Sequence, residues 1–140
     1  MDPREISDRL EITDLLARYA DAIDHQRWDD LDGVFTADAV IDYTAFGVPR
    51  GGVAETKQFL AEAMPGHVSY THLLGLPVIT IAGDTATART PCQNPMVYLD
   101  ADAKEQVYVC GLWYDDRLVR TPDGWRIAER VEEKCYLTGL

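Results

Sequence analysis

Hydrophobic residues in the first half of the chain recur at helical spacing. Between residues 3 and 25 one helical face is formed, at intervals of four, three and four positions, by Ile12, Leu16, Tyr19 and Ile23. The same periodicity predicts further helices over residues 28–35 and 53–64, with a short strand over 39–43 between them. The first half is therefore predicted to be mainly helical.

The second half alternates between hydrophobic and polar positions and is rich in β-branched residues, which is typical of strands. Strands are predicted, with turn residues between them, over 67–82, 85–98, 106–120 and 125–136. Gly75 and Pro77 interrupt the first of these strands. One extra residue there would reverse the alternation, so that even-numbered positions before Gly75 and odd-numbered positions after it share one face. Helices followed by hairpin-linked strands indicate an α+β fold. We expect a strongly bent antiparallel sheet, a cone-shaped α+β barrel, wrapped on three N-terminal helices around an internal pocket.

Length and charge limit the classes of function. The 140 residues predict one domain over 1–140, and no apolar run approaches the roughly 18 residues of a membrane span. The net charge of −11 argues against nucleic acid and anionic membranes as partners. Cys92, Cys110 and Cys135 are odd in number and lack CxxC spacing, and the N-terminus has no apolar leader. These features predict a cytoplasmic protein with free thiols.

Asp24 and His72 are the first candidates for chemistry. An imidazole titrates near neutral pH and can remove and return a proton, and a buried carboxylate can hold its tautomer. The alternative is that Asp24 caps a helix or faces water while His72 is a hydrogen-bonded core residue. Tyr19 lies on the same helix as Asp24, so its hydroxyl could bind a leaving oxygen or simply pack in the core.

Two further residues are candidates on predicted strands. Tyr43 could donate a hydrogen bond to a substrate carbonyl, and Arg130 could stabilise a developing anion. Strict alternation places Arg130 on the face opposite Trp125, so it reaches the pocket only if the last strand bulges or the sheet bends; otherwise it forms a surface ion pair. The two other histidines, His25 and His67, are expected to be exposed. No spacing typical of metal ligands is present, so we expect neither a metal nor a cofactor.

The order of elements resembles the nuclear-transport-factor-two-like superfamily, in particular its SnoaL-like branch. The segment 19–43 resembles scytalone dehydratase, and the set Tyr19, Asp24 and His72 is similar to the catalytic set of bile-acid 7α-dehydratase. The ending 130–136 resembles hexachlorocyclohexane dehydrochlorinase, in which the arginine matching Arg130 is catalytic. The resemblance implies an acid–base lyase whose catalytic residues are Asp24, His72, Tyr19 and Arg130.

Departures from these relatives argue against their particular substrates. Cys92 stands where scytalone dehydratase has a second histidine, Tyr108 and Cys110 replace its serine and asparagine, and Tyr19 replaces a lysine of the dehydrochlorinase. The substrate-binding wall is predicted to contain Tyr43, Cys92, Tyr108, Cys110, Leu16, Phe46, Leu74 and Leu112.

Such an apolar wall favours a hydrophobic cyclic compound such as a polyketide, terpenoid or steroid. We therefore expect a cofactor-independent lyase that eliminates water and forms a homo-oligomer, either a dimer or a trimer. An isomerase or cyclase of the same fold, or a non-catalytic scaffold that binds a small molecule, remains open, because the fold alone does not decide.

Overall fold

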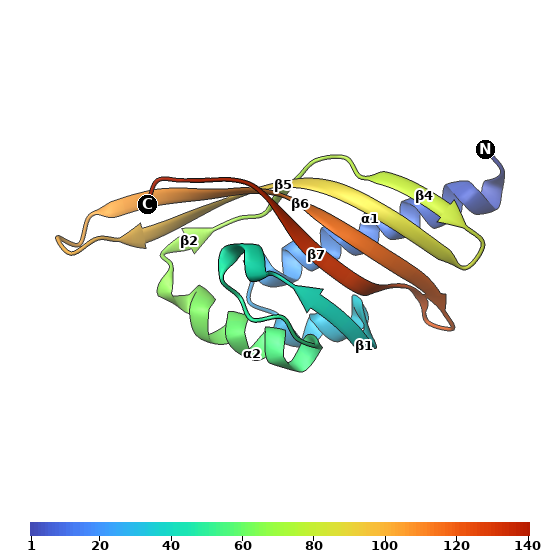
Figure 1. Cartoon of the computed structure of the whole chain (residues 1–140), viewed down its shortest axis with the longest axis horizontal. Coiled ribbons are helices and arrows are strands. Elements are labelled where there is room, and N and C mark those ends of the chain that lie inside the picture. The colour runs from blue at the N-terminus through green and yellow to red at the C-terminus, as the bar shows by residue number, and fades with distance from the viewer.

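The computed structural model describes all 140 residues and has the predicted α+β architecture (Figure 1). Its helical elements are α1 (Pro3–Asp24), η1 (Trp28–Gly33), η2 (Thr44–Phe46), α2 (Val53–Ala63) and η3 (Met64–Gly66), of which the three η elements are 3₁₀ turns. Its strands are β1 (Phe35–Asp42), β2 (Ser69–Tyr70), β3 (Leu73–Leu74), β4 (Val78–Ala82), β5 (Thr85–Leu99), β6 (Glu105–Thr121) and β7 (Gly124–Thr138). Figure 1 shows α1 running along the sheet, with α2 below the sheet and the edge strand β1 beside β7.

The first helix begins and packs as its sequence predicts. The Asp2 carboxylate accepts a hydrogen bond of 2.8 Å from the backbone N–H of Glu5, and a proline occupies the first helical turn. The predicted helical face is at most 2% exposed along its whole length at Ile12, Leu16, Tyr19 and Ile23. Because Asp24 is the last residue of α1, its carboxylate lies at the end of this buried face.

The seven strands form one open, bent sheet in the order β1-β7-β6-β5-β2, and β3 and β4 also pair with β5. Antiparallel hairpins join β4 to β5, β5 to β6 and β6 to β7, as expected from the turn residues. The strand β1 instead pairs in parallel with β7, which makes the sheet mixed. No hairpin connects these two strands, so no turn sets an antiparallel direction.

The segment predicted as one strand over 67–82 is divided into the short strands β2, β3 and β4. Between β2 and β3 the backbone carbonyl of Thr71 accepts a hydrogen bond of 2.9 Å from the Asn94 side chain. At Gly75 the chain approaches β5 so closely that an added Cβ would lie 2.5 Å from Pro91. These two contacts bend the segment, and they present His72 at the break.

The last strand contains the bulge on which the orientation of Arg130 depends. Ile127 pairs with Leu118 and Glu129 pairs with Arg117, so Ala128 is an extra residue in β7. The bulge reverses the parity of the strand and returns Arg130 to the buried face that also holds Trp125 and Ile127. Arg130 therefore does not lie on the surface.

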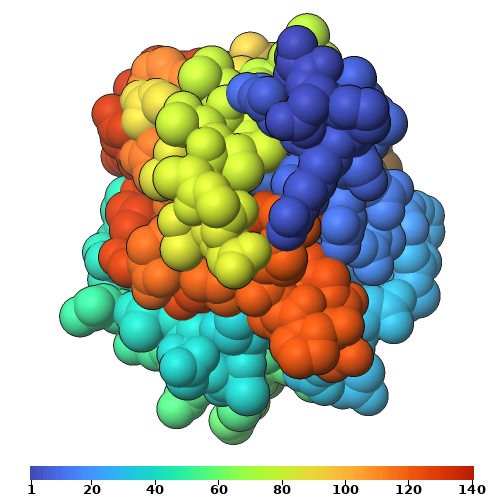
Figure 2. All heavy atoms as spheres, turned by 90° about the vertical axis from the view of Figure 1, so that its right-hand side faces the viewer, coloured from blue at the N-terminus to red at the C-terminus, as the bar shows by residue number.

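Polar contacts hold the start of α1 against the sheet. The Asp8 carboxylate binds both terminal nitrogens of Arg120 at 2.7 and 2.9 Å and accepts the indole N–H of Trp125 at 3.0 Å. Arg9 donates to the backbone carbonyl of Ile79 on β4 at 3.1 Å. Figure 2 shows this end of the molecule, where the start of α1 lies beside the β4–β5 segment. No helix of the chain combines the length and the apolar character needed to cross a bilayer.

Candidate active site

A cavity of about 440 Å³ lies between the sheet, the C-terminal end of α1, η2 and α2. Of the 21 residues in its wall, 17 are hydrophobic, so it offers an apolar ligand a large contact area. The four others are His67, His72, Asn94 and Glu132. Any acid–base chemistry in the cavity depends on these residues and on the hydroxyl groups of its tyrosines.

His72 and Asp24 form the hydrogen-bonded pair that the sequence predicts. The distance between His72 Nδ1 and Asp24 Oδ1 is 2.6 Å, and the two side chains are 8% and 15% exposed. Because Nδ1 donates to the carboxylate, the neutral imidazole has its lone pair on Nε2. His72 lines the cavity, whereas Asp24 lies behind it and acts on a ligand only through the imidazole.

The carboxylate of Asp24 is held by further hydrogen bonds. It accepts the backbone N–H of His72 at 3.1 and 3.0 Å and the Thr71 hydroxyl at 3.3 Å. Burial by itself would raise the pKa of Asp24, but the hydrogen bonds from His72 and the charge of its imidazole outweigh this effect and lower the pKa below 3.8. Asp24 is therefore ionised at neutral pH. Its contribution to stability is lost only as the pH falls through this lowered pKa.

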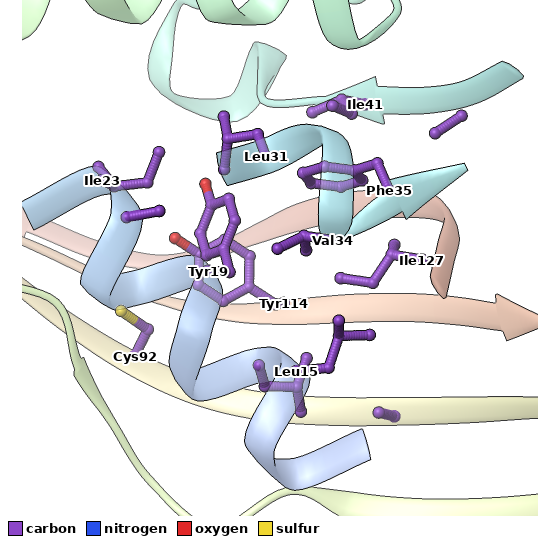
Figure 3. Packing of buried hydrophobic residues seen from close by; sticks show 14 of the residues in the cluster. Leu15, Tyr19, Ile23, Leu31, Val34, Phe35, Ile41, Cys92, Tyr114 and Ile127 are labelled. Atoms are coloured by element: carbon purple, nitrogen blue, oxygen red, sulfur yellow. The ribbon is translucent and has the colours of Figure 1, made fainter. Parts of the chain in front are cut away.

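Three tyrosines form one side of the cavity. The hydroxyls of Tyr19 and Tyr43 are 2.5 Å apart, and the rings of Tyr19 and Tyr114 meet edge to face with centroids 5.7 Å apart. Figure 3 shows Tyr19 and Tyr114 side by side above the strands. Burial raises the pKa of Tyr19 to about 12, although the charge of Arg130 opposes this effect. At neutral pH these phenols are thus hydrogen-bond donors and not phenolates.

Arg130 lies behind this aromatic wall and does not line the cavity. Its Nε and one terminal nitrogen bind both oxygens of Asp116 at 2.7 and 2.8 Å, and the two side chains are at most 1% exposed. The guanidinium carbon is 4.3 Å from the ring centroid of Tyr19 and 4.0 Å from that of Tyr114. Arg130 therefore places a buried positive charge against the back of two phenol rings, where it cannot touch a ligand.

The other predicted binding residues divide into two groups. Those that line the cavity, besides Tyr19, Tyr43 and His72, are Phe46, Tyr108, Cys110 and Leu112. Leu16 belongs to the core beneath the cavity at 2% exposure. Cys92 is likewise a core residue at 2% exposure, close to Tyr114. Leu74 pairs with Cys92 across β3 and β5 and borders a separate groove. None of these three touches the cavity, where the sequence had placed them.

Sequence reasoning missed two polar residues of the wall. His67, expected to be exposed, is half-buried; its Nδ1 lies 3.2 Å from the Met64 carbonyl, and its Nε2 lies 2.7 Å from the Tyr108 hydroxyl. The short turn η3 brings it inward, and no pattern in the sequence indicated this. Glu132, for which the sequence suggested no role in the cavity, lines it because the bulge at Ala128 turns residues 130 and 132 inward together.

Residues 4–131 match the family model of the SnoaL-like domain, and the chain therefore belongs to this family. The resemblance seen in the sequence is confirmed.

The chain is also similar to a curated protein and to solved structures. The uncharacterized protein Rv2910c of Mycobacterium tuberculosis is 54% identical over 132 residues, which cover 94% of this chain and 88% of that protein. A putative aromatic ring hydroxylase from Novosphingobium aromaticivorans is 28% identical with a TM-score of 0.81, covering 100% of this chain and 96% of the other. A putative scytalone dehydratase from the same species has a TM-score of 0.86 at 16% identity, covering 100% and 92%, and shows the fold alone.

Proposed function

We propose that this protein is a cofactor-independent lyase that eliminates water from a hydrophobic cyclic compound. The observation that carries the proposal is the 2.6 Å hydrogen bond between His72 and Asp24 in the wall of an apolar cavity. A histidine oriented by a buried carboxylate, with its second nitrogen available to a ligand, is the arrangement that general-base catalysis requires. The putative scytalone dehydratase of the same fold is consistent with this class of reaction.

The groups present account for every proton in such an elimination. His72 Nε2 removes a proton from a carbon next to a carbonyl group, and the charge of Asp24 stabilises the imidazolium. The electron pair of the broken C–H bond forms a C=C bond as the hydroxyl on the next carbon leaves. The paired hydroxyls of Tyr19 and Tyr43 bind this leaving oxygen, and the imidazolium returns the proton so that water departs.

An isomerase would use the same base and return the proton to a different carbon. Both reactions begin with proton removal, and only the elimination needs a leaving group. A pair of ligands, one with a β-hydroxyl group and one without it, therefore distinguishes them. A non-catalytic scaffold would bind both ligands and change neither.

The test is a panel of cyclic β-hydroxyketones with the matching deoxy ketones as controls. Stabilisation against heating identifies binders, and mass spectrometry and enone absorbance detect the loss of water. Hydrogen–deuterium exchange at the α-carbon of a bound deoxy ketone, followed by NMR in D₂O, reports proton removal without elimination. The lyase proposal requires dehydration of a β-hydroxyketone by the wild type. Binding with neither exchange nor dehydration would identify a scaffold.

The variant His25→Gln is the matched control for this assay. The His25 side chain is 62% exposed and lies outside the cavity, so its replacement should leave the rates unchanged. Loss of activity in this variant would mean that the reaction does not take place in the cavity.

We also propose that the protein acts as a dimer or trimer in the cytoplasm. Of the three aromatic residues of β6, Tyr114 is buried and Tyr108 lines the cavity, but Trp113 remains partly exposed with Arg89 stacked 4.8 Å from its ring centroid. Val78 on β4, opposite Arg89 of β5, is 70% exposed. These groups suit a contact between subunits. Light scattering at micromolar concentration should give a multiple of 15.7 kDa, and a monomer alone would contradict this.

A further inference from the structure

Glu132 is the one acidic side chain in the wall of the cavity. It lies on β7 opposite Tyr114 of β6, on the side of the cavity formed by the tyrosines. The mechanism proposed above does not use it. The wall contains 17 hydrophobic residues, and removing an ionised carboxylate from water into such surroundings costs free energy. A carboxyl group at this position therefore suggests a function.

No cation neutralises this carboxyl group. Arg130 and Lys134 are the nearest residues of opposite charge along the strand, each two positions away. Arg130 forms its ion pair with Asp116 through Nε and Nη2, while its Nη1 is buried without a hydrogen-bond partner. Lys134 is exposed, with its Nζ 5.9 Å from the ring centroid of Phe46. Burial raises the pKa of Glu132 to about 8, although the charge of Arg130 opposes this effect. At pH 7 the group is therefore mainly a neutral carboxylic acid with one O–H to donate.

Several titratable groups surround Glu132, but most of them keep their charge between pH 7 and 9.5. Titratable and charged groups face Glu132 from every neighbouring element. They are Arg130 and Lys134 on β7, Cys110 and Tyr114 on β6, Cys92 on β5, Tyr19 on α1, Asp42 on β1 and Tyr43 at the start of η2. Burial raises the pKa of Cys110 to about 11 and that of Tyr19 to about 12, and it raises the pKa of Tyr43 and of Tyr114 well above the usual range of a phenol. Among the carboxyl, thiol and phenol groups of this set, Glu132 is thus the one that changes charge between pH 7 and 9.5.

Most other polar groups of the wall are already bound to protein. Tyr19 is paired with Tyr43, and His67 with Tyr108. The amide of Asn94 donates to the Thr71 carbonyl. On the side of the cavity that holds Tyr114, a polar ligand atom therefore meets the Glu132 carboxyl as a donor, next to the Tyr114 hydroxyl with which it interacts. His72 Nε2 remains as an acceptor.

We propose that the Glu132 carboxyl binds the carbonyl oxygen of the ligand, so that the cavity takes neutral cyclic ketones and rejects carboxylates of the same shape. The ligand is the substrate of the lyase, and to that extent the inference rests on the proposed function. During elimination the negative charge that develops on the carbonyl oxygen is stabilised by the Glu132 O–H, and the proton stays on Glu132. Deprotonated Glu132 would repel the same oxygen.

The test measures binding directly, with 1-tetralone as the neutral ketone and 1-naphthoate as the carboxylate. Titration calorimetry at pH 7 and pH 9.5 should show that the wild type binds 1-tetralone about tenfold more weakly at the higher pH, the worth of one such hydrogen bond. Glu132→Gln keeps a donor without a charge and should bind 1-tetralone equally at both values. This variant should also bind 1-naphthoate at least about tenfold more tightly than the wild type does at pH 9.5.

Two controls separate this inference from the lyase proposal. Glu129→Gln removes an exposed carboxylate from the same strand and should retain the pH dependence of the wild type. His72→Gln should also retain it, so the binding result does not depend on turnover. The infrared band of a protonated carboxyl group should disappear between pH 7 and 9.5 in the wild type and be absent from Glu132→Gln.

Several outcomes would overturn the inference. These are failure of 1-tetralone to bind at millimolar concentration, equal binding by the wild type at both pH values, and a pH dependence that persists in Glu132→Gln. Absence of turnover together with the predicted binding pattern would refute the lyase and leave Glu132 as the ligand-binding group.

Discussion

Replacing His72 with glutamine should reduce the rate of elimination by about 10²- to 10⁴-fold without unfolding the protein. Glutamine can still donate a hydrogen bond to the Asp24 carboxylate, so the loop between β2 and β3 keeps its main contact. It cannot take up a proton, and the general base is lost. Steady-state kinetics on the β-hydroxyketone found in the screen, with the unfolding midpoint as a check on folding, measure the effect.

Asp24→Asn should lose a comparable factor, because the amide preserves the shape but cannot stabilise the imidazolium. The double variant should be little slower than either single variant, since the two residues act as a unit through the 2.6 Å hydrogen bond. Additive losses in the double variant would mean that the residues act separately. Full activity of His72→Gln would remove the base from the proposed mechanism.

Arg130→Met should lower the free energy of unfolding by about 3–5 kcal/mol. The reason is that Asp116, whose side chain is 0% exposed, would be left as a buried and unpaired charge. The stacking of the guanidinium on Tyr19 and Tyr114 would be lost as well. Urea unfolding monitored by tryptophan fluorescence measures the change.

A double variant and a surface control test the cause of this loss. Arg130→Met combined with Asp116→Leu removes both charges and should recover most of the stability, because a buried ion pair can be replaced by apolar side chains at little cost. Arg117→Met removes an arginine whose side chain is 53% exposed and which lies 3.7 Å from Glu129, and it should change stability little. Wild-type stability of Arg130→Met would contradict the structural role inferred here.

Local physical rules in the sequence predicted the two α-helices and the long strands. They did not predict that the helix expected over 28–35 is the 3₁₀ turn Trp28–Gly33, that β1 begins at Phe35, or that the segment 67–82 is divided. The spacing of hydrophobic positions and the cap at Asp2 predicted α1 to within a residue, and turn residues predicted the long hairpins. The pairing of Asp24 with His72, 48 positions apart, was predicted from the match of their spacing to related lyases. Periodicity alone left open whether Asp24 and His72 form a functional pair or are an ordinary surface residue and an ordinary core residue.

Only the tertiary structure decided what the remaining polar residues contact. Alternation along β7 placed Arg130 and Glu132 outside, whereas a single extra residue at Ala128 turned both inward and gave Arg130 the partner Asp116 from the neighbouring strand. The same shift placed Glu132 in the cavity wall without a cation. Side-chain pattern reports which residues share a face, but a bulge depends on backbone packing between strands. Whether a charge is paired depends on segments far away in the chain. Local spacing could therefore predict neither the bulge at Ala128 nor the pairing of Arg130 with Asp116.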